Sequence, residues 1–85
     1  MAKKFILDVL PFFRSGDISC MTPMGVQIGD VDWMCDPRSG HGFPDHGNAR
    51  SVFAALSRRS MPPDHPWPQS QLDAYDQWMR DGFER

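Results

Sequence analysis

The chain has 85 residues and a formal net charge of −2 at pH 7, and its basic residues occur as isolated pairs such as Lys3-Lys4 and Arg58-Arg59. This distribution argues against a nucleic-acid-binding protein, which would carry a basic stripe or patch. No apolar run is long enough to cross a bilayer, and no small-residue cleavage site follows the apolar N-terminal segment. We therefore expect a cytoplasmic protein without membrane contact, built as a single domain over residues 1–85 with little stability to spare.

Residues 3–14 predict the first helix, because their apolar side chains recur at helical spacing and form one broad face. Pro11 is expected to bend this helix near its last turn, and Gly16 is expected to end it. Residues 17–47 are rich in turn-forming pairs that contain proline or glycine, so they predict a long loop with a short helical turn over residues 30–34. A loop of this length inside a small domain is expected to wrap something.

Residues 49–58 predict a second helix, for which Asn48 is a good N-cap. A third helix is predicted from residues 68–70 to residue 81, with Gly82 ending it and Phe83 packing after it. The side chains that these two helices are expected to bury are Val52, Phe53, Leu56, Leu72, Tyr75, Trp78 and Met79. The predicted fold class is therefore all-α, with three helices and a long central loop.

Two stretches of the chain resemble class I cytochromes c, in particular the small bacterial type. The stretch DVLPFFRSGDISCM is similar to the opening helix of that family and to the segment where the family keeps its haem-attachment motif, Cys-x-x-Cys-His. The stretch MPPDHPWPQSQLDAYDQWMRDGF resembles the family's Met-Pro-Pro segment and closing helix, and NARSVFAALSRRS resembles the helix that precedes this methionine. The resemblance implies a three-helix cytochrome-c-like domain in which Met61 would correspond to the axial methionine.

The chain departs from the family at the haem-attachment motif. When Cys20 is aligned with the second cysteine of the motif, Asp17 stands in place of the first cysteine and Met21 in place of the proximal histidine. The proximal ligand is among the main controls on haem chemistry, so covalent haem attachment as in the family is not expected. We expect a haem-free chain in which methionine and aromatic side chains fill the volume of the cofactor.

An electron-transfer or metal-binding protein with non-covalent haem, copper or iron stays open as an alternative function. Met21 and Met61 would bracket such a haem, with Cys20 as a thiolate ligand, and the imidazoles and carboxylates of the loop are ligand types that zinc, copper and iron use. The opposing interpretation is that Asp45 and Asn48 cap the second helix while the loop histidines are solvated. The candidate metal or haem ligands are His41, Asp45, His46, His65, Cys20 and Met61.

The remaining sequence features favour neither a knuckle-type metal site nor catalysis. Cys20 and Cys35 fit no metal-knuckle spacing, and in a reducing compartment both are expected as buried free thiols rather than as a disulfide. No nucleophile has a histidine at a spacing that the sequence fixes, and there is no glycine-rich phosphate loop, so we expect no enzymatic activity. A third interpretation makes the domain a substrate or carrier of a modifying enzyme, with a cysteine or tryptophan as the target.

The favoured function is a haem-free binding or accessory module that associates with a larger enzyme, of a redox or metal-dependent kind. Loops on a rigid scaffold are where recognition residues lie, and this chain has a large loop surface. The proline-flanked segment PPDHPWP presents Trp67 either as a partner anchor or as a side chain folded back onto the third helix. The residues expected to contact the partner are Trp67, His65, Trp33 and Phe43.

Overall fold

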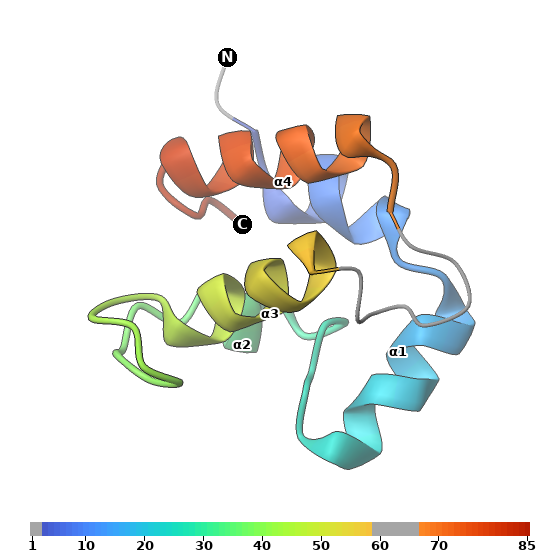
Figure 1. Ribbon diagram of the computed structural model, residues 1–85, viewed down its shortest axis with the longest axis horizontal. Helices are drawn as coiled ribbons and strands as arrows, with labels where there is room; N and C mark the ends of the chain where they lie inside the picture. Colours follow the sequence, from blue (N-terminus) through green and yellow to red (C-terminus); the bar gives the residue numbers. More distant parts are fainter. Residues whose placement is uncertain (1–2, 59–66) are drawn as a thin grey trace.

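The computed structural model describes residues 3–58 and 67–85, apart from the side chains of Cys20 and Met24, and every regular element in this part of the chain is helical. In Figure 1, α4 lies across the opening segment of the chain, α3 runs below α4, and the loop before α3 extends to the left. The predicted all-α class is therefore confirmed. The elements are η1 (Phe5–Val9, π-helical), η2 (Leu10–Phe12, 3-10), α1 (Ser15–Met21), η3 (Thr22–Met24, 3-10), α2 (Val31–Met34), α3 (Gly47–Ser57) and α4 (Gln69–Arg80).

The opening segment forms two short turns of different type instead of one α-helix. The N–H of Leu10 donates to the carbonyl of Phe5, five residues earlier, so the turn of η1 is wider than that of an α-helix. Pro11 has no N–H and cannot make the α-helical bond to the residue four positions earlier. The chain therefore continues as the 3-10 turn η2 and becomes extended at Phe13. The prediction of one helix over residues 3–14 is wrong, and Pro11 is the physical reason.

Helix α1 begins where the sequence predicted that a helix ends. Oδ2 of Asp17 accepts a hydrogen bond from the backbone N–H of Arg14 at 3.0 Å, and the guanidinium of Arg14 donates to both carboxylate oxygens at 3.1 and 2.8 Å. A carboxylate in the first turn satisfies a free N–H group and interacts favourably with the helix dipole. The predictions that Gly16 closes a helix and that a loop begins at residue 17 are wrong, because Asp17 starts a helix here.

The helical turn predicted over residues 30–34 is present as α2. Oδ1 of Asp30 accepts hydrogen bonds from the backbone N–H groups of Asp32 at 2.9 Å and Trp33 at 3.3 Å. Aspartate is a favourable N-cap because its side chain pairs with N–H groups that the first helical turn leaves free. This cap fixes the start of α2, the short helix that carries Trp33 just before the loop that leads to α3.

Helix α3 begins two residues before the predicted boundary, at Gly47. His46 holds the N-cap position with a left-handed backbone, and the predicted cap, Asn48, lies inside the helix and bonds elsewhere. The N–H of Gly47 donates to the carbonyl of Arg38 at 3.1 Å, and a Cβ atom at Gly47 would overlap the backbone of Gly40. A residue without a side chain is needed at this close approach of two backbones.

Helix α4 follows the prediction closely. Its apolar face buries Leu72, Tyr75 and Trp78, as expected from their spacing, while Met79 is half-buried. Gly82 ends the helix with a φ of 105°, and the ring of Phe83 lies 5.3 Å from the indole of Trp78.

Backbone hydrogen bonds join the first and last described segments of the chain. The carbonyl of Glu84 accepts hydrogen bonds from the N–H of Phe5 at 2.8 Å and from Nε1 of Trp78 at 2.7 Å. The N–H of Ile6 donates to the carbonyl of Arg85 at 3.2 Å, and Lys4 and Glu84 form a parallel bridge. These bonds form a terminal clamp between residues 3–6 and residues 84–85.

Aromatic rings fill the interior from this clamp to the opposite end of α4. The ring of Tyr75 lies 5.2 Å from the indole of Trp78, and the Tyr75 hydroxyl donates to the carbonyl of Ala49 in α3 at 2.7 Å. Trp67 is only 3% exposed, and its indole contacts Tyr75 together with Phe12 and Phe13. Edge-to-face and tilted ring pairs of this kind add to the stabilisation from burial alone. The core of the described chain is therefore built on tryptophan and tyrosine side chains of α4 and the segment before it.

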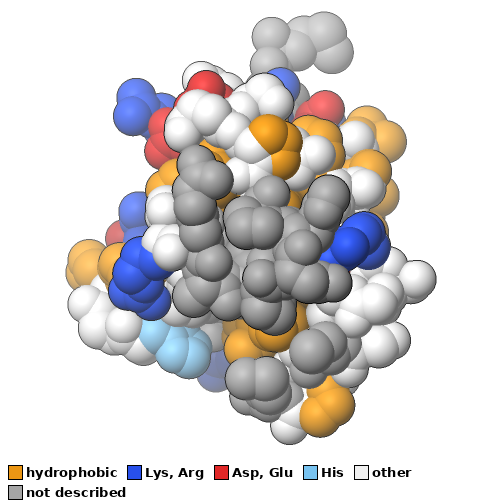
Figure 2. All heavy atoms as spheres, turned by 45° about the vertical axis from the view of Figure 1, so that its right-hand side comes forward, with side chains coloured by type: hydrophobic (Ala, Val, Ile, Leu, Met, Phe, Trp, Pro, Cys, Tyr) orange, Lys and Arg blue, Asp and Glu red, His pale blue; other side chains and the backbone are white. Residues whose placement is uncertain are grey.

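The large hydrophobic residues that the described surface exposes lie on η1. Ile6 is 49% exposed and Leu7 is 71% exposed. On the face shown in Figure 2, hydrophobic side chains reach the surface at the upper right and also at the left edge and near the bottom. None of the described helices is both long enough and apolar enough to pass through a membrane.

The close approach at the start of α3 predicts that Gly47→Ala destabilises the fold. The added methyl group would force the Gly40 backbone away, so we expect the free energy of unfolding to fall by about 2 kcal/mol. Gly16→Ala is the matched control, because nothing lies within 4 Å of a Cβ at this helical position. That change is expected to raise the free energy of unfolding by about 0.5 kcal/mol, since alanine restricts the unfolded chain. Urea unfolding followed by circular dichroism measures both values, and equal effects of the two substitutions would contradict the proposed overlap.

Candidate functional site

The segment between α2 and α3 is a compact loop whose two ends meet. The carbonyl of Pro37 accepts from the N–H of His46 at 3.1 Å. At the outer part of the loop, Gly40 and Phe43 exchange two backbone hydrogen bonds, of 3.1 and 2.9 Å. We call residues 37–46 the closed loop. Its internal bonds hold Phe43, a half-buried aromatic side chain, in a defined place on the surface.

Asn48 connects the closed loop to α2. Its side-chain Oδ1 accepts from Nε2 of His41 at 3.1 Å, and its Nδ2 donates to the carbonyl of Trp33 at 3.0 Å. His41 is exposed, whereas Trp33 and Asn48 are half-buried. The four residues Trp33, His41, Phe43 and Asn48 are defined here as the loop surface. Two residues expected at a partner contact, Trp33 and Phe43, are thus bonded through their backbones, Trp33 to Asn48 and Phe43 to Gly40.

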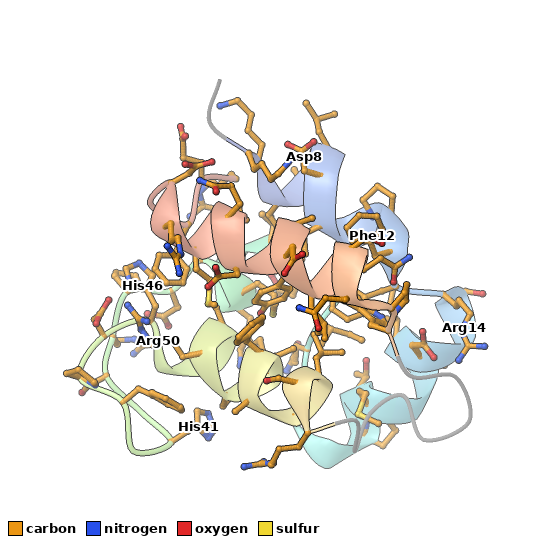
Figure 3. The ribbon with its side chains drawn as sticks, turned by 45° about the horizontal axis from the view of Figure 1, so that its top comes forward. Asp8, Phe12, Arg14, His41, His46 and Arg50 are labelled. Carbon is orange, nitrogen blue, oxygen red and sulfur yellow. The ribbon has the colours of Figure 1, made fainter. Side chains whose placement is uncertain are left out.

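A second cluster lies where the closed loop joins α3. Oδ2 of Asp45 accepts from Nδ1 of His46 at 2.7 Å and from Nη2 of Arg50 at 3.1 Å. These hydrogen bonds, from His46 first and Arg50 second, lower the pKa of Asp45 below its usual range. The His46 ring stacks on Phe83 at 3.7 Å, and the guanidinium of Arg50 lies 5.3 Å from the centre of the same ring. Figure 3 shows His46 and Arg50 close together beside the C-terminal end of α4, with His41 farther along the loop.

The other end of the closed loop is held by an ion pair between Asp36 and Arg38. The Arg38 guanidinium donates to Oδ2 of Asp36 at 2.6 Å, and the Arg38 N–H donates to Oδ1 at 3.0 Å. The side-chain bond and then the backbone bond lower the pKa of Asp36 to about 2. Each end of the closed loop therefore has an aspartate whose charged form is hydrogen-bonded.

The residues predicted to contact a partner do not all lie on this surface. Trp67 is buried against Tyr75, which matches the interpretation that it folds back onto the third helix. It contributes no exposed area to a partner contact. Trp33 and Phe43 are joined through the closed loop and Asn48, while His65 lies outside the described residues.

The candidate metal or haem ligands are also distributed over separate places. Asp45 and His46 bond to each other, but His41 bonds to Asn48, so the two histidines face different partners. Met61 lies outside the described residues, as do the side chain of Cys20 and the whole of His65. Within the described residues no three histidine, cysteine or acidic side chains come together as a metal site would require. The interpretation that Asp45 and Asn48 cap α3 is wrong, because their side chains bond to His46, Arg50, His41 and Trp33.

The positions at which the resemblance predicts the haem-attachment motif, Asp17 to Met21, lie in α1. Asp17 is buried and bonded to Arg14, and Met21 is half-buried against the core. Cys35, at the end of α2, is a half-buried free thiol, and burial raises its pKa. A thiol of raised pKa has less of the thiolate that reacts with electrophiles and metals.

Sequence reasoning missed three residues of the site. They are Asn48, which bridges the closed loop and α2, and the pair Arg50 and Phe83. Phe83 was expected only to pack after the third helix, and Arg50 carried no prediction. The signal for Asn48 was its polar side chain at the start of a helix, which a cap explains equally well. Arg50 and Phe83 meet through the fold alone, since they are far apart in sequence.

No protein-family model, curated protein or solved structure matches this chain.

The lowered pKa values of Asp36 and Asp45 predict a loss of stability in acid. An aspartate in an unfolded chain has a pKa of about 3.9. Because folding lowers this pKa, each carboxylate stabilises the fold above about pH 4 and loses that contribution as the pH falls through its folded pKa, which is about 2 for Asp36. Asp45→Asn should therefore lower the urea midpoint at pH 7 and have a smaller effect at pH 2. The control is Asp73→Asn, an exposed residue of α4 that accepts a bond from Gln69. An Asp45→Asn effect that does not change with pH would contradict the assignment.

Proposed function

We propose that this chain is a non-catalytic binding module that acts in the cytoplasm and associates with a larger enzyme through its loop surface. The proposal is carried by the closed loop itself, which is hydrogen-bonded at both ends, holds the backbone of Phe43 and is linked through His41 and Asn48 to the carbonyl of Trp33. Recognition residues are commonly found on loops that a rigid scaffold positions.

The energetics of association favour such a surface. An aromatic side chain on a pre-formed loop offers a large contact area and loses little conformational freedom on binding. Phe43 and Trp33 are half-buried, so each residue keeps some exposed surface, and Trp33 also packs against the core. Burial of Trp67 removes that residue from the proposed contact, while His65 stays a predicted contact outside the described residues.

We further infer a cytochrome-c-like arrangement that works without haem. Helix α4 lies in one of the stretches that carry the family resemblance, and η1 leads into the other, which begins at Asp8; η1 and α4 pack against each other through Phe5 and Trp78, whose rings lie 5.3 Å apart. At the position of the first family cysteine, Asp17 is engaged by Arg14. The proposal that the partner is an enzyme rests on the resemblance, because the small domains of this type are attached to larger enzymes.

The test is a comparison of Phe43→Ala with the unmodified chain in binding to the protein that the immobilised chain retains from its own host. We expect Phe43→Ala to weaken the affinity by about tenfold or more, as is usual for a central aromatic contact. Leu7→Ala is the matched control, since Leu7 is a more exposed apolar side chain on a different element. It should leave the affinity unchanged. Calorimetry with the purified partner measures each affinity, and near-ultraviolet circular dichroism verifies that both variants are folded.

Two results would overturn the proposed binding surface. One is retention of no specific protein by the folded chain. The other is equal binding by Phe43→Ala and the unmodified chain, which would move the contact away from the closed loop.

A further inference from the structure

The junction between the closed loop and the C-terminal segment is held in an unfavourable backbone conformation. Among the described residues, three that are not glycine have a positive φ, namely His41 at 54°, His46 at 47° and Phe83 at 57°. Side chains on L-residues rarely adopt this region, and a bulky aromatic residue there is a marked exception. Two of the three, His46 and Phe83, lie on different elements and contact each other directly. Strain at both partners of one contact indicates that the contact itself is what the fold maintains.

The stacking geometry of the His46 and Phe83 rings is also unusual. The rings of His46 and Phe83 are parallel within 4° and their centres are 3.7 Å apart, so they overlap face to face. Aromatic rings generally prefer an offset or edge-to-face arrangement. The surroundings must therefore hold the two rings together. Arg50 does so from α3, because it contacts the Phe83 ring and donates from Nε to the carbonyl of Asp45 at 3.0 Å.

Each strained residue also closes its own segment. The N–H of Phe83 donates to the carbonyl of Trp78 at 3.2 Å, which completes the C-terminal cap of α4. The N–H of His46 donates to Pro37, and the next N–H, that of Gly47, donates to Arg38. His46 is thus the residue at which the closed loop shuts, and its ring is the point at which the loop is tied to the end of α4.

We propose that the closed loop is a conformational latch, shut when His46 stacks on Phe83 and open when the two rings separate. In the open form both residues can relax to a negative φ, so the backbone strain favours opening. The ring stack and the bonds of Asp45 and Arg50 oppose opening. Opening breaks the bonds from His46 and Gly47 to residues 37 and 38 and releases Phe43 from its fixed position. The purpose of the latch, control of the loop surface, rests on the proposed function, but the latch itself is a property of the free chain.

Amide hydrogen exchange of the free chain tests the latch without any partner. In the unmodified chain, the amide of Gly47 should exchange faster than the core amides of α4, because loop opening does not require global unfolding. His46→Ala removes the stack but keeps a side chain in the strained conformation, so exchange at Gly47 should accelerate by about tenfold while the α4 amides stay unchanged. Phe83→Ala also removes the stack, but it loses the packing on Trp78 as well, so it should accelerate exchange at both Gly47 and the α4 amides.

His41→Ala is the matched control. His41 is in the same loop and is strained in the same way, but it is not part of the stack, so Gly47 exchange should stay within about twofold of the unmodified chain. Equal exchange of Gly47 and the α4 amides in every variant would overturn the latch, since the loop would then open only with the whole fold. Faster exchange in His46→Ala without any change in partner affinity would keep the latch and reject its role in the proposed function.

Discussion

The carbonyl of Glu84 accepts two hydrogen bonds, from the backbone of Phe5 and from the indole of Trp78. This double acceptor joins the start of the chain, the last helix and the C-terminal segment at one atom. A buried indole N–H without a partner would be costly, so the bond to Glu84 favours the observed orientation of Trp78. The rings of Phe5, Tyr75 and Phe83 then pack around an indole whose position is set. The aromatic core therefore depends on a polar contact at its edge.

The hydrogen-bonded Glu84 is also linked to the candidate site, through its neighbour Phe83. Phe83 directly precedes Glu84, so the clamp holds its ring against Trp78 on one side and His46 on the other. His46 closes the loop that displays Phe43. A chain of direct contacts thus leads from the terminal clamp to the proposed partner surface. In a domain of this size the core and the closed loop share Phe83 as a supporting residue, so a change at Phe83 is expected to affect both.

The parts of the fold that the sequence predicted are those determined by local patterns. The spacing of Leu72, Tyr75 and Trp78 identified α4, and Asp30 with the following turn identified α2. The opening segment was harder, because helix spacing does not reveal that Pro11 divides it into turns of two types. Helix α1 was missed because Gly16 is typical of a helix end, whereas the pairing of Arg14 with Asp17 starts a helix.

The candidate site was predicted in part for the same reason. Trp33 and Phe43 could be chosen as aromatic residues of a loop, but the proline-flanked Trp67 fitted burial and exposure equally well until its neighbours were known. The contact between His46 and Phe83, and the left-handed backbone of both, follow from the meeting of two distant segments. No local pattern contains that information.

If aromatic packing around Trp78 holds the fold without a cofactor, the chain keeps its tertiary structure when neither haem nor metal is present. Urea unfolding of the chemically synthesised 85-residue chain, free of haem and metal and followed by near-ultraviolet circular dichroism, tests this directly. We expect a strong signal from fixed tryptophan and tyrosine side chains that is lost in one cooperative transition. A chain that shows helical signal but no near-ultraviolet signal until haem or a metal is added would contradict it, because the core would then depend on the cofactor.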